Sequence, residues 1–263
     1  MLDRYGFEHE LANGARGAVY RGREISTGCA VAIKVFPDAA DGESGEHPAP
    51  PLQLRDQHHS GLNHPEVAPV HAHGREGNLC YVVTALAPGR DLSAHDRPPR
   101  LLPLHTVLRV ITRVAGALQH AHTRGVVHGD VKPGNIVFDS RTGAVSLIDF
   151  PVASNVDSGT PAYLAPERLC GAAASAASDQ FALGVTLYRL ACGNAPFSGR
   201  SWPEIAYGVV HAPHTDIRVH APAVTPGLAR IIDKALAKDP AKRYRSIASM
   251  GRALARLLRA RPW

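Results

Sequence analysis

Four polar residues lie close together near the middle of the sequence. Asp130, Lys132 and Asn135 fall within one short segment, and Asp149 follows it after two β-like stretches. Transfer of a phosphoryl group requires a hydroxyl held in line and cations that neutralise the phosphate charge, with little covalent work for the protein. An acid, an amine, an amide and a second acid at this spacing supply those groups. The fold must therefore bring these four side chains to one site.

The segment from His128 to Asn135, together with Asp149, resembles the catalytic loop and the metal-binding loop of the protein kinase family. The resemblance implies that Asp130 orients the substrate hydroxyl and that Lys132 contacts the γ-phosphate of ATP. It also implies that Asn135 and Asp149 hold Mg²⁺, a hard cation that prefers oxygen ligands. Mn²⁺ is the alternative metal.

A second part of the resemblance lies near the N-terminus. Residues 11–20 resemble the glycine-rich loop of the family, with Ala12 in place of its first glycine. Glycine lets a backbone approach a phosphate without a Cβ in the way. The segment Val31–Lys34 follows at the distance seen in the family, which implies that Lys34 is a catalytic residue that holds the α- and β-phosphates.

Three arrangements stay open for the partner of Lys34. In the family a glutamate from the following helix pairs with this lysine, but counting back from residues 62–65 places Arg55 at that position. Either the neighbouring Asp56 substitutes, or Lys34 pairs only with Asp149, or the ion pair is absent. A regulatory protein partner that repositions this helix is a further alternative.

The spacing of apolar residues predicts a β-rich first part of the chain. A loop is expected at 38–51 and one helix at 52–59, before the last two strands. The expected fold class is α+β, a bilobal protein-kinase-like fold with a five-stranded antiparallel N-lobe and a mainly helical C-lobe. The expected strands are Phe7–Leu11, Ala18–Arg23, Cys29–Phe36, Val67–Ala72 and Leu79–Leu86.

From Pro103 the apolar spacing becomes helical, which predicts a long amphipathic helix that ends near Gly125. Short strands are expected at 136–138 and 145–148. We place the N-lobe and hinge at residues 1–87 and the C-lobe at residues 88–263. The apolar residues expected to face the core from this helix are Val107, Ile111, Val114, Leu118 and Ala121.

The resemblance also implies which residues surround ATP. Thr84 falls at the position that controls access behind the adenine, and residues 85–87 fall at the hinge. The residues implied in nucleotide binding are Leu11, Gly14, Gly17, Val19, Ala32, Lys34, Thr84, Leu86, Val137 and Ile148.

The segment 159–167 resembles the substrate-docking segment of the family. Within it Thr160 is the Ser/Thr-type signature, and the resemblance gives it a catalytic role through hydrogen bonds around the catalytic loop. Two further contacts are implied: Asp179 braces the backbone of the catalytic loop, and Arg243 pairs with Glu167.

Two departures from the family pattern bear on regulation. Gly129 stands where the family has an arginine, and that arginine normally binds a phosphorylated activation loop. The segment 151–158 is also short for such a loop, so we expect that activity does not depend on its phosphorylation. Pro151 replaces a glycine, which removes a backbone N–H and fixes φ, so the metal-binding loop should be stiff.

Composition excludes several classes of protein. Of the 263 residues 44% are apolar and 20% are charged, as in globular rather than disordered chains. The net charge of +6 comes mostly from arginines, which are scattered except near the C-terminus, so no nucleic-acid partner is expected. No apolar run is long enough for a membrane span, and no signal-peptide pattern opens the sequence. We expect a soluble chain, complete at its start.

The cysteines and histidines of the sequence give no indication of a metal site. The four cysteines are far apart and form no C-x-x-C pair, so neither a zinc site nor a disulfide framework is indicated and a reducing cytoplasm fits best. His120 and His122 have a metal-ligand spacing, but no third ligand accompanies them, and single satisfied or solvent-facing histidines are expected.

The segment 252–261 alternates arginine with Leu and Ala, which favours a final amphipathic helix with a solvated basic face over a surface for a membrane or an acidic partner.

The sequence therefore predicts a Ser/Thr protein kinase that uses ATP and Mg²⁺ on protein substrates. One alternative is a pseudokinase that binds nucleotide or a protein partner and acts as a regulatory scaffold. A second is a small-molecule phosphotransferase, because His128-Gly129-Asp130 and Asn135 also resemble the loop of aminoglycoside and choline kinases. Lys132 and the segment 159–167 argue against that second alternative.

Overall fold

The structure is a computed structural model that describes residues 2–14, 17–37, 62–150 and 161–260. Contacts along the described chain divide it into two compact units, one that runs to Ala87 and one that begins at Pro88. The helix expected at 52–59 lies outside the described residues. None of the described helices is long and apolar enough to cross a lipid bilayer.

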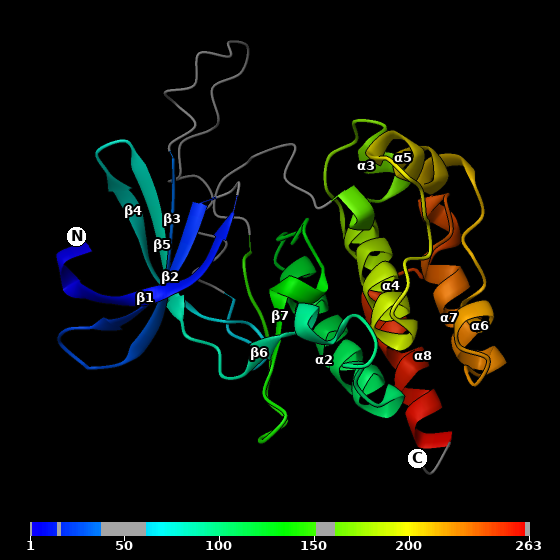
Figure 1. Ribbon diagram of the computed structural model, residues 1–263, viewed down its shortest axis with the longest axis horizontal. Coiled ribbons are helices and arrows are strands. Elements are labelled where there is room, and N and C mark those ends of the chain that lie inside the picture. The colour runs from blue at the N-terminus through cyan, green and yellow to red at the C-terminus, as the bar shows by residue number, and fades with distance from the viewer. Residues whose placement is uncertain (1, 15–16, 38–61, 151–160, 261–263) are drawn as a thin grey trace. The chain divides into compact units, whose positions relative to one another are not determined.

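The first unit contains the expected five-stranded antiparallel sheet, in the order β1-β2-β3-β5-β4 (Figure 1). A short 3-10 helix, Leu2–Arg4, precedes the first strand. The strands are β1 (Tyr5–Gly14), β2 (Gly17–Glu24), β3 (Ala30–Pro37), β4 (Val70–Glu76) and β5 (Leu79–Ala85).

The two faces of this sheet differ because side chains alternate along each strand. On β3, Val31 and Ile33 are buried, whereas Ala32 and Lys34 point to the opposite face and are partly exposed. The hydrophobic core of the unit therefore lies on one face of the sheet, and the opposite face is partly exposed. The buried cluster consists of Tyr5, Val31, Ile33, Tyr81 and Val83.

The predicted boundaries of the fourth strand, 67–72, are wrong. The strand β4 begins at Val70 and continues to Glu76. Val67 instead belongs to a turn, where its N–H donates to the carbonyl of His64. Pro69 has no N–H to donate, so the regular strand starts after it, although its carbonyl accepts from the Ala85 N–H at 2.9 Å. Pairing of Glu76 with Leu79 then extends the strand to the hairpin turn.

The second unit is mainly helical, as expected, and α4 lies at its centre. Almost every residue of α4 is buried, because α2, α7 and α8 pack around it (Figure 1). A small sheet in the order β6-β7-β8 carries the loops of the candidate site. The strands are β6 (Arg90–Asp91), β7 (Ile136–Phe138) and β8 (Val145–Leu147). The α-helices are α2 (Leu104–His122), α3 (Pro166–Leu169), α4 (Ala176–Cys192), α5 (Trp202–His211), α6 (Ile217–His220), α7 (Pro226–Ala235) and α8 (Ile247–Ala260). Short 3-10 helices occupy Leu92–His95, Pro133–Asn135, Pro161–Tyr163 and Pro240–Lys242.

The predicted long helix is α2, and all five apolar residues expected to face the core are buried. It ends at His122, a few residues before the segment that carries Asp130. The final helix is also present as α8, which buries Ile247, Met250 and Leu254. Both helices follow the 3.6-residue period of their sequences, which is why their faces could be predicted.

Candidate active site

Asp130, Lys132 and Asn135 come together in the second unit. The Lys132 Nζ lies 2.7 Å from the Asp130 Oδ2. The Asn135 Nδ2 donates to the main-chain oxygen of Asp130 at 2.7 Å and approaches its Oδ2 at 3.2 Å. Because both contacts use the amide nitrogen, the Asn135 amide oxygen is the atom left to accept from a cation or a water. The acid is thus held beside one amine and one amide.

The local sequence explains the shape of this loop. Val131 is fully buried and anchors the loop between its two polar neighbours. Pro133 then opens a 3-10 turn, in which the Asn135 N–H donates to the Lys132 carbonyl at 3.0 Å. Proline is favoured at the first position of a helix because its missing N–H would have no partner there. The turn brings Asn135 back toward Asp130.

Asp179 in the first turn of α4 holds the backbone before Asp130, as expected. Its carboxylate, 1% exposed, accepts from the main-chain N–H of His128 at 2.9 Å and of Gly129 at 2.7 Å. It also contacts the His122 Nε2 at 2.8 Å. His122 was expected to be a single satisfied or solvent-facing histidine, and this partner was not predicted. One feature of the sequence indicates that the His122 ring is covered. His122 lies four residues after the buried Leu118, on the same side of α2.

His128 links the acid loop to the loop that carries Asp149. Its Nδ1 accepts from the Asp130 N–H at 3.2 Å, and its Nε2 contacts the Ile148 carbonyl oxygen at 2.9 Å. These contacts require the neutral ring with its proton on Nε2, because only that nitrogen faces an acceptor. The ring also packs on Phe150, with the centroids 4.6 Å apart.

Asn135 and Asp149 lie at the same end of the β7–β8 hairpin. The Ile148 N–H donates to the Asn135 carbonyl at 3.0 Å, which places the next residue, Asp149, beside it. Asp149 has a φ of 65°, the one positive value among the described non-glycine residues. Such a conformation costs energy and is found where the surroundings impose it, often at functional sites. The predicted metal ligands are therefore neighbours.

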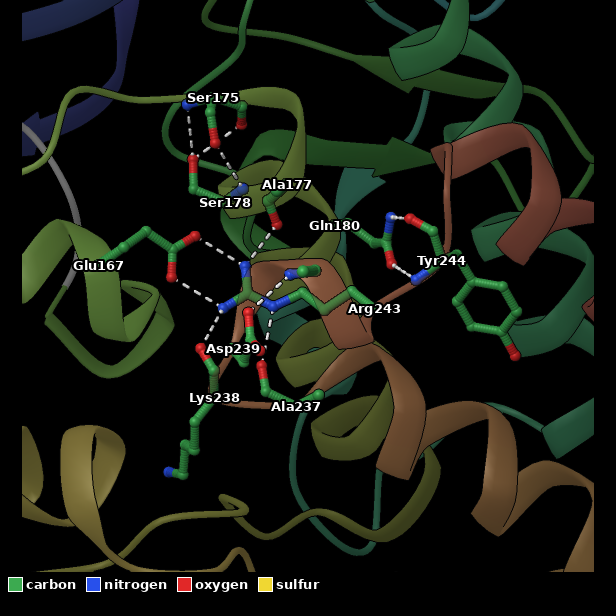
Figure 2. A network of polar contacts seen from close by, with 11 residues as sticks. Glu167, Ser175, Ala177, Ser178, Gln180, Ala237, Lys238, Asp239, Arg243 and Tyr244 are labelled. Atoms are coloured by element: carbon green, nitrogen blue, oxygen red, sulfur yellow. Dashed lines mark hydrogen bonds and ion pairs between the residues drawn. The ribbon is translucent and has the colours of Figure 1, made fainter.

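The expected pair of Arg243 and Glu167 is confirmed, and Figure 2 shows its surroundings. Both guanidinium nitrogens of the fork lie 2.7 Å from the carboxylate oxygens. The remaining donors bond to the main-chain oxygens of Ala177, Ala237 and Lys238, so all five N–H groups are used. The Arg243 side chain is completely buried. This one residue joins α3, the start of α4 and the segment before α8.

Two neighbouring contacts fix the start of α4 and the segment that precedes α8 (Figure 2). Ser175 and Ser178 form a reciprocal capping box, which satisfies the first N–H groups of the helix. The Gln180 amide bonds to both the N–H and the carbonyl of Tyr244. The cap determines where α4 begins and therefore where Asp179 lies along it.

The first unit brings several predicted nucleotide-binding residues to one sheet face. Lys34 is paired across the ladder with Val19, and Ala32 with Thr84. Residues directly opposite in an antiparallel pair share a face, so these side chains lie opposite the core. Gly17 has a φ of 102°, and an added Cβ would meet the Val35 carbonyl at 2.1 Å, so only glycine fits there.

The other predicted nucleotide-binding residues are spread over both units. In the first unit Leu11 is exposed at a bulge of β1, Gly14 ends that strand, and the Leu86 N–H donates to Ala30 at 3.4 Å. In the second unit Val137 lies in β7 and Ile148 directly follows β8. Each unit thus presents its own part of the predicted set.

Comparison with known proteins decides the family. The sequence matches the protein kinase domain over residues 5–253. The chain belongs to the protein kinase family. It is 34% identical to the serine/threonine-protein kinase PknA of Mycobacterium tuberculosis, over 94% of this chain and 59% of that protein. It is 35% identical to the DNA damage-responsive serine/threonine-protein kinase RqkA of Deinococcus radiodurans, over 95% of this chain and 39% of that protein.

Solved structures agree with this assignment to the protein kinase fold. The crystal structure of the PknI kinase domain of Mycobacterium tuberculosis matches with a TM-score of 0.76 at 30% identity, over 96% of each chain. The chain spans 59% of PknA and 39% of RqkA, so it corresponds to part of these relatives. The expected family and fold are confirmed.

Several calls that depend on the kinase pattern lie outside the described residues. These are the catalytic role of Thr160, the stiffening by Pro151, and the presence of Arg55 at the glutamate position with Asp56 as a substitute partner for Lys34. Gly129 is described: it has a φ of 75°, and an added Cβ would find nothing nearer than the Ala174 Cβ at 3.6 Å. The position has room for a side chain, but its backbone conformation favours glycine.

Proposed function

We propose that this chain is a serine/threonine protein kinase that transfers the γ-phosphate of ATP to protein hydroxyl groups. The observation that carries the proposal is the convergence of Lys132 and Asn135 on the carboxyl group of Asp130. The names of the relatives PknA and RqkA support Ser/Thr as the acceptor class.

Asp130 would accept a hydrogen bond from the substrate hydroxyl and hold it in line with the phosphorus atom. Proton transfer to a positioned carboxylate contributes about 10²–10⁴-fold in such reactions. Lys132, held 2.7 Å from the same carboxyl group, would also contact the γ-phosphate and balance its charge. Asn135 fixes the orientation of Asp130 through its amide nitrogen.

The donor set at the end of the β7–β8 hairpin fits Mg²⁺, and Mn²⁺ as its alternative. Asn135 offers an amide oxygen and Asp149 a carboxylate, the hard oxygen ligands that Mg²⁺ takes while it keeps several waters. A metal ion bound there would neutralise charge on the β- and γ-phosphates. The Ile148 contacts to Asn135 and His128 would hold the two ligands together.

Lys34 is proposed to hold the α- and β-phosphates from the face of the first sheet that lies opposite its core. Gly14 and Gly17 would let the backbone approach the phosphates. Val19, Ala32, Thr84 and Leu86 of that unit, with Leu11, would contact the adenosine, as would Val137 and Ile148 of the second unit. Thr160 is proposed to hydrogen-bond around Asp130 and Lys132.

We also propose that activity does not require phosphorylation of the segment 151–158. Gly129 has no charged side chain, so it cannot supply the charge-assisted bonds by which an arginine would bind a phosphorylated loop. Single replacement of Ser154 or Ser158 by alanine is expected to leave turnover unchanged. A requirement for either hydroxyl would overturn this part of the proposal. A cytoplasmic location is part of this proposal, because the four cysteines are far apart in the sequence and indicate no disulfide framework.

The test is transfer of labelled γ-phosphate from ATP, with Mg²⁺ and then Mn²⁺, to the chain itself and to generic protein substrates. Asp130→Asn is the control, because it keeps the shape of the loop and removes the carboxylate. Label on Ser or Thr that disappears in the control supports the kinase. Nucleotide that raises the melting temperature without transfer would point to the pseudokinase, and transfer only to small hydroxyl compounds would point to the small-molecule enzyme.

A further inference from the structure

The helices α2 and α8 lie side by side in the second unit and run in opposite directions (Figure 1). The Ala248 N–H donates to the Gln119 Oε1 at 3.2 Å. Further along, a Cβ on Gly251 would lie 3.2 Å from the Ala115 Cβ. The small residues at this crossing let the helices approach closely, and their outer faces together form one surface.

That surface carries arginine on both helices. We call it the arginine face and define it by five exposed residues, Arg109, Arg113, Arg252, Arg256 and Arg259. Within each helix these positions are three or four residues apart, so they lie on one side of that helix about one turn apart. Neither α2 nor α8 contains an aspartate or a glutamate.

The adjoining β7–β8 hairpin does not bring an exposed acid to this face. Arg113 donates to the Gly143 carbonyl of the hairpin at 2.6 Å, which fixes their proximity. The hairpin carboxylate, Asp139, is buried and accepts from the Thr142 Oγ1 at 2.7 Å and from the Arg141 N–H at 2.9 Å. Arg141 itself is exposed. The face therefore attracts anions from solvent.

The chemistry of the face selects phosphate-bearing surfaces. All five cations are arginine, whose planar fork bonds to phosphate with two parallel N–H groups and is more weakly hydrated than lysine. Neither helix contains Phe, Tyr or Trp, so the face has no aromatic side chain on which bases of a single-stranded nucleic acid could stack. It also lacks the tryptophan and tyrosine anchors that, together with arginine, are enriched at the centres of specific protein interfaces.

We propose that the arginine face binds the surface of an anionic lipid bilayer through its phosphate headgroups. The apolar sides of α2 and α8 are buried in the unit, so the helices have no free apolar face to insert and would adhere electrostatically. Lipid headgroups can move within the surface of a fluid bilayer, so they can reach rows of arginines that do not form a pocket. The polybasic attraction to such membranes falls off within a Debye length, so binding should weaken with salt.

The test is sedimentation of the whole chain with vesicles of phosphatidylcholine alone and with vesicles that also contain phosphatidylglycerol. The variant replaces Arg109, Arg252, Arg256 and Arg259 by glutamine; Arg113 is kept because it also holds the hairpin. The matched control replaces four other exposed arginines, Arg75, Arg97, Arg200 and Arg218, by glutamine, which removes the same net charge. Circular dichroism checks that both remain folded.

We expect the chain to bind only the anionic vesicles, and to be released by salt. Each arginine near an anionic surface contributes about fivefold to partitioning, so the variant, which lacks four of them, should lose roughly 600-fold of its affinity, and the control much less. Equal losses in the two variants would overturn the proposal, since net charge alone would then explain binding. So would no binding to the anionic vesicles, or tighter binding of duplex DNA or an acidic peptide through the same arginines.

Discussion

The Nε2 of His128 donates a hydrogen bond of 2.9 Å to the carbonyl oxygen of Ile148, the residue directly before Asp149. The same ring accepts from the Asp130 N–H through its Nδ1. One imidazole therefore connects the acid proposed to orient the substrate with the acid proposed to hold the metal.

Replacing His128 by phenylalanine keeps a ring against Phe150 but removes both hydrogen bonds. Because a lost buried hydrogen bond leaves its partner unsatisfied, we expect the free energy of unfolding to fall by roughly 1–3 kcal/mol, with slower phosphoryl transfer. Urea denaturation and initial transfer rates measure the two effects. His9→Phe, on the exposed strand β1, is the matched control. Unchanged transfer in His128→Phe would show that the ring does not align the two acids.

Asp179→Ala should be more harmful than Asp179→Asn. Alanine leaves the N–H groups of His128 and Gly129 without an acceptor, at a cost of about 1–3 kcal/mol for each buried group. Asparagine keeps one oxygen and the same shape. We expect both the melting temperature and the transfer rate to follow the order wild type, Asn, Ala. Equal behaviour of the two variants would argue that Asp179 acts only by filling space.

The pair of Arg243 and Glu167 should behave as a buried ion pair. Removal of one partner of such a pair costs about 3–5 kcal/mol, because the other charge stays buried and unpaired. We therefore expect Arg243→Met and Glu167→Gln each to lower the free energy of unfolding strongly, and the double variant to lose less than the sum. A double-mutant cycle in urea measures this coupling. Additive losses would mean that the main-chain bonds of Arg243, not Glu167, carry its effect.

Lys238 should give the stability a dependence on alkaline pH. Burial, and then the nearby Arg243 guanidinium, lowers the pKa of Lys238 from its ordinary 10.5 to about 8. Between these values the unfolded chain binds more protons than the folded chain, so the free energy of unfolding rises with pH across that window. Lys238→Met should flatten the rise. Urea melts at several pH values measure it, with the exposed Lys234→Met as the control. An identical slope in Lys238→Met would refute the assignment.

Features that depend on short-range patterns could be predicted from the sequence. The core-facing residues of α2 and the presence of all five strands follow from the period of apolar residues. The meeting of Asp130, Lys132 and Asn135 follows from their spacing in one loop. The role of Arg243 was available only through its resemblance to the family, because Glu167 lies 76 residues earlier in the sequence.

Other features depend on contacts that no local pattern records. The bounds of β4 differ from the prediction because Pro69 has no N–H to donate, although its carbonyl accepts from the Ala85 N–H, and because the hairpin with β5 extends the far end of the strand. The pairing of His122 with Asp179 joins residues 57 positions apart, and histidine gives little indication of its partner in sequence. The bond between His128 and Ile148 ends on a main-chain oxygen, so the identity of residue 148 carries no sign of it.

The main-chain hydrogen bonds of Ile148 determine which substitutions at this position the protein should tolerate. Its N–H and its carbonyl both hold the candidate site together, whereas its side chain takes part in neither bond. Most substitutions of the Ile148 side chain would therefore leave both main-chain bonds in place and would change only the size and polarity of the side chain. Proline is the informative exception, because it alone among the encoded residues deletes the N–H. Replacing this amide by an ester through chemical synthesis would remove the same N–H, and with it the hydrogen bond to the Asn135 carbonyl, without altering any side chain.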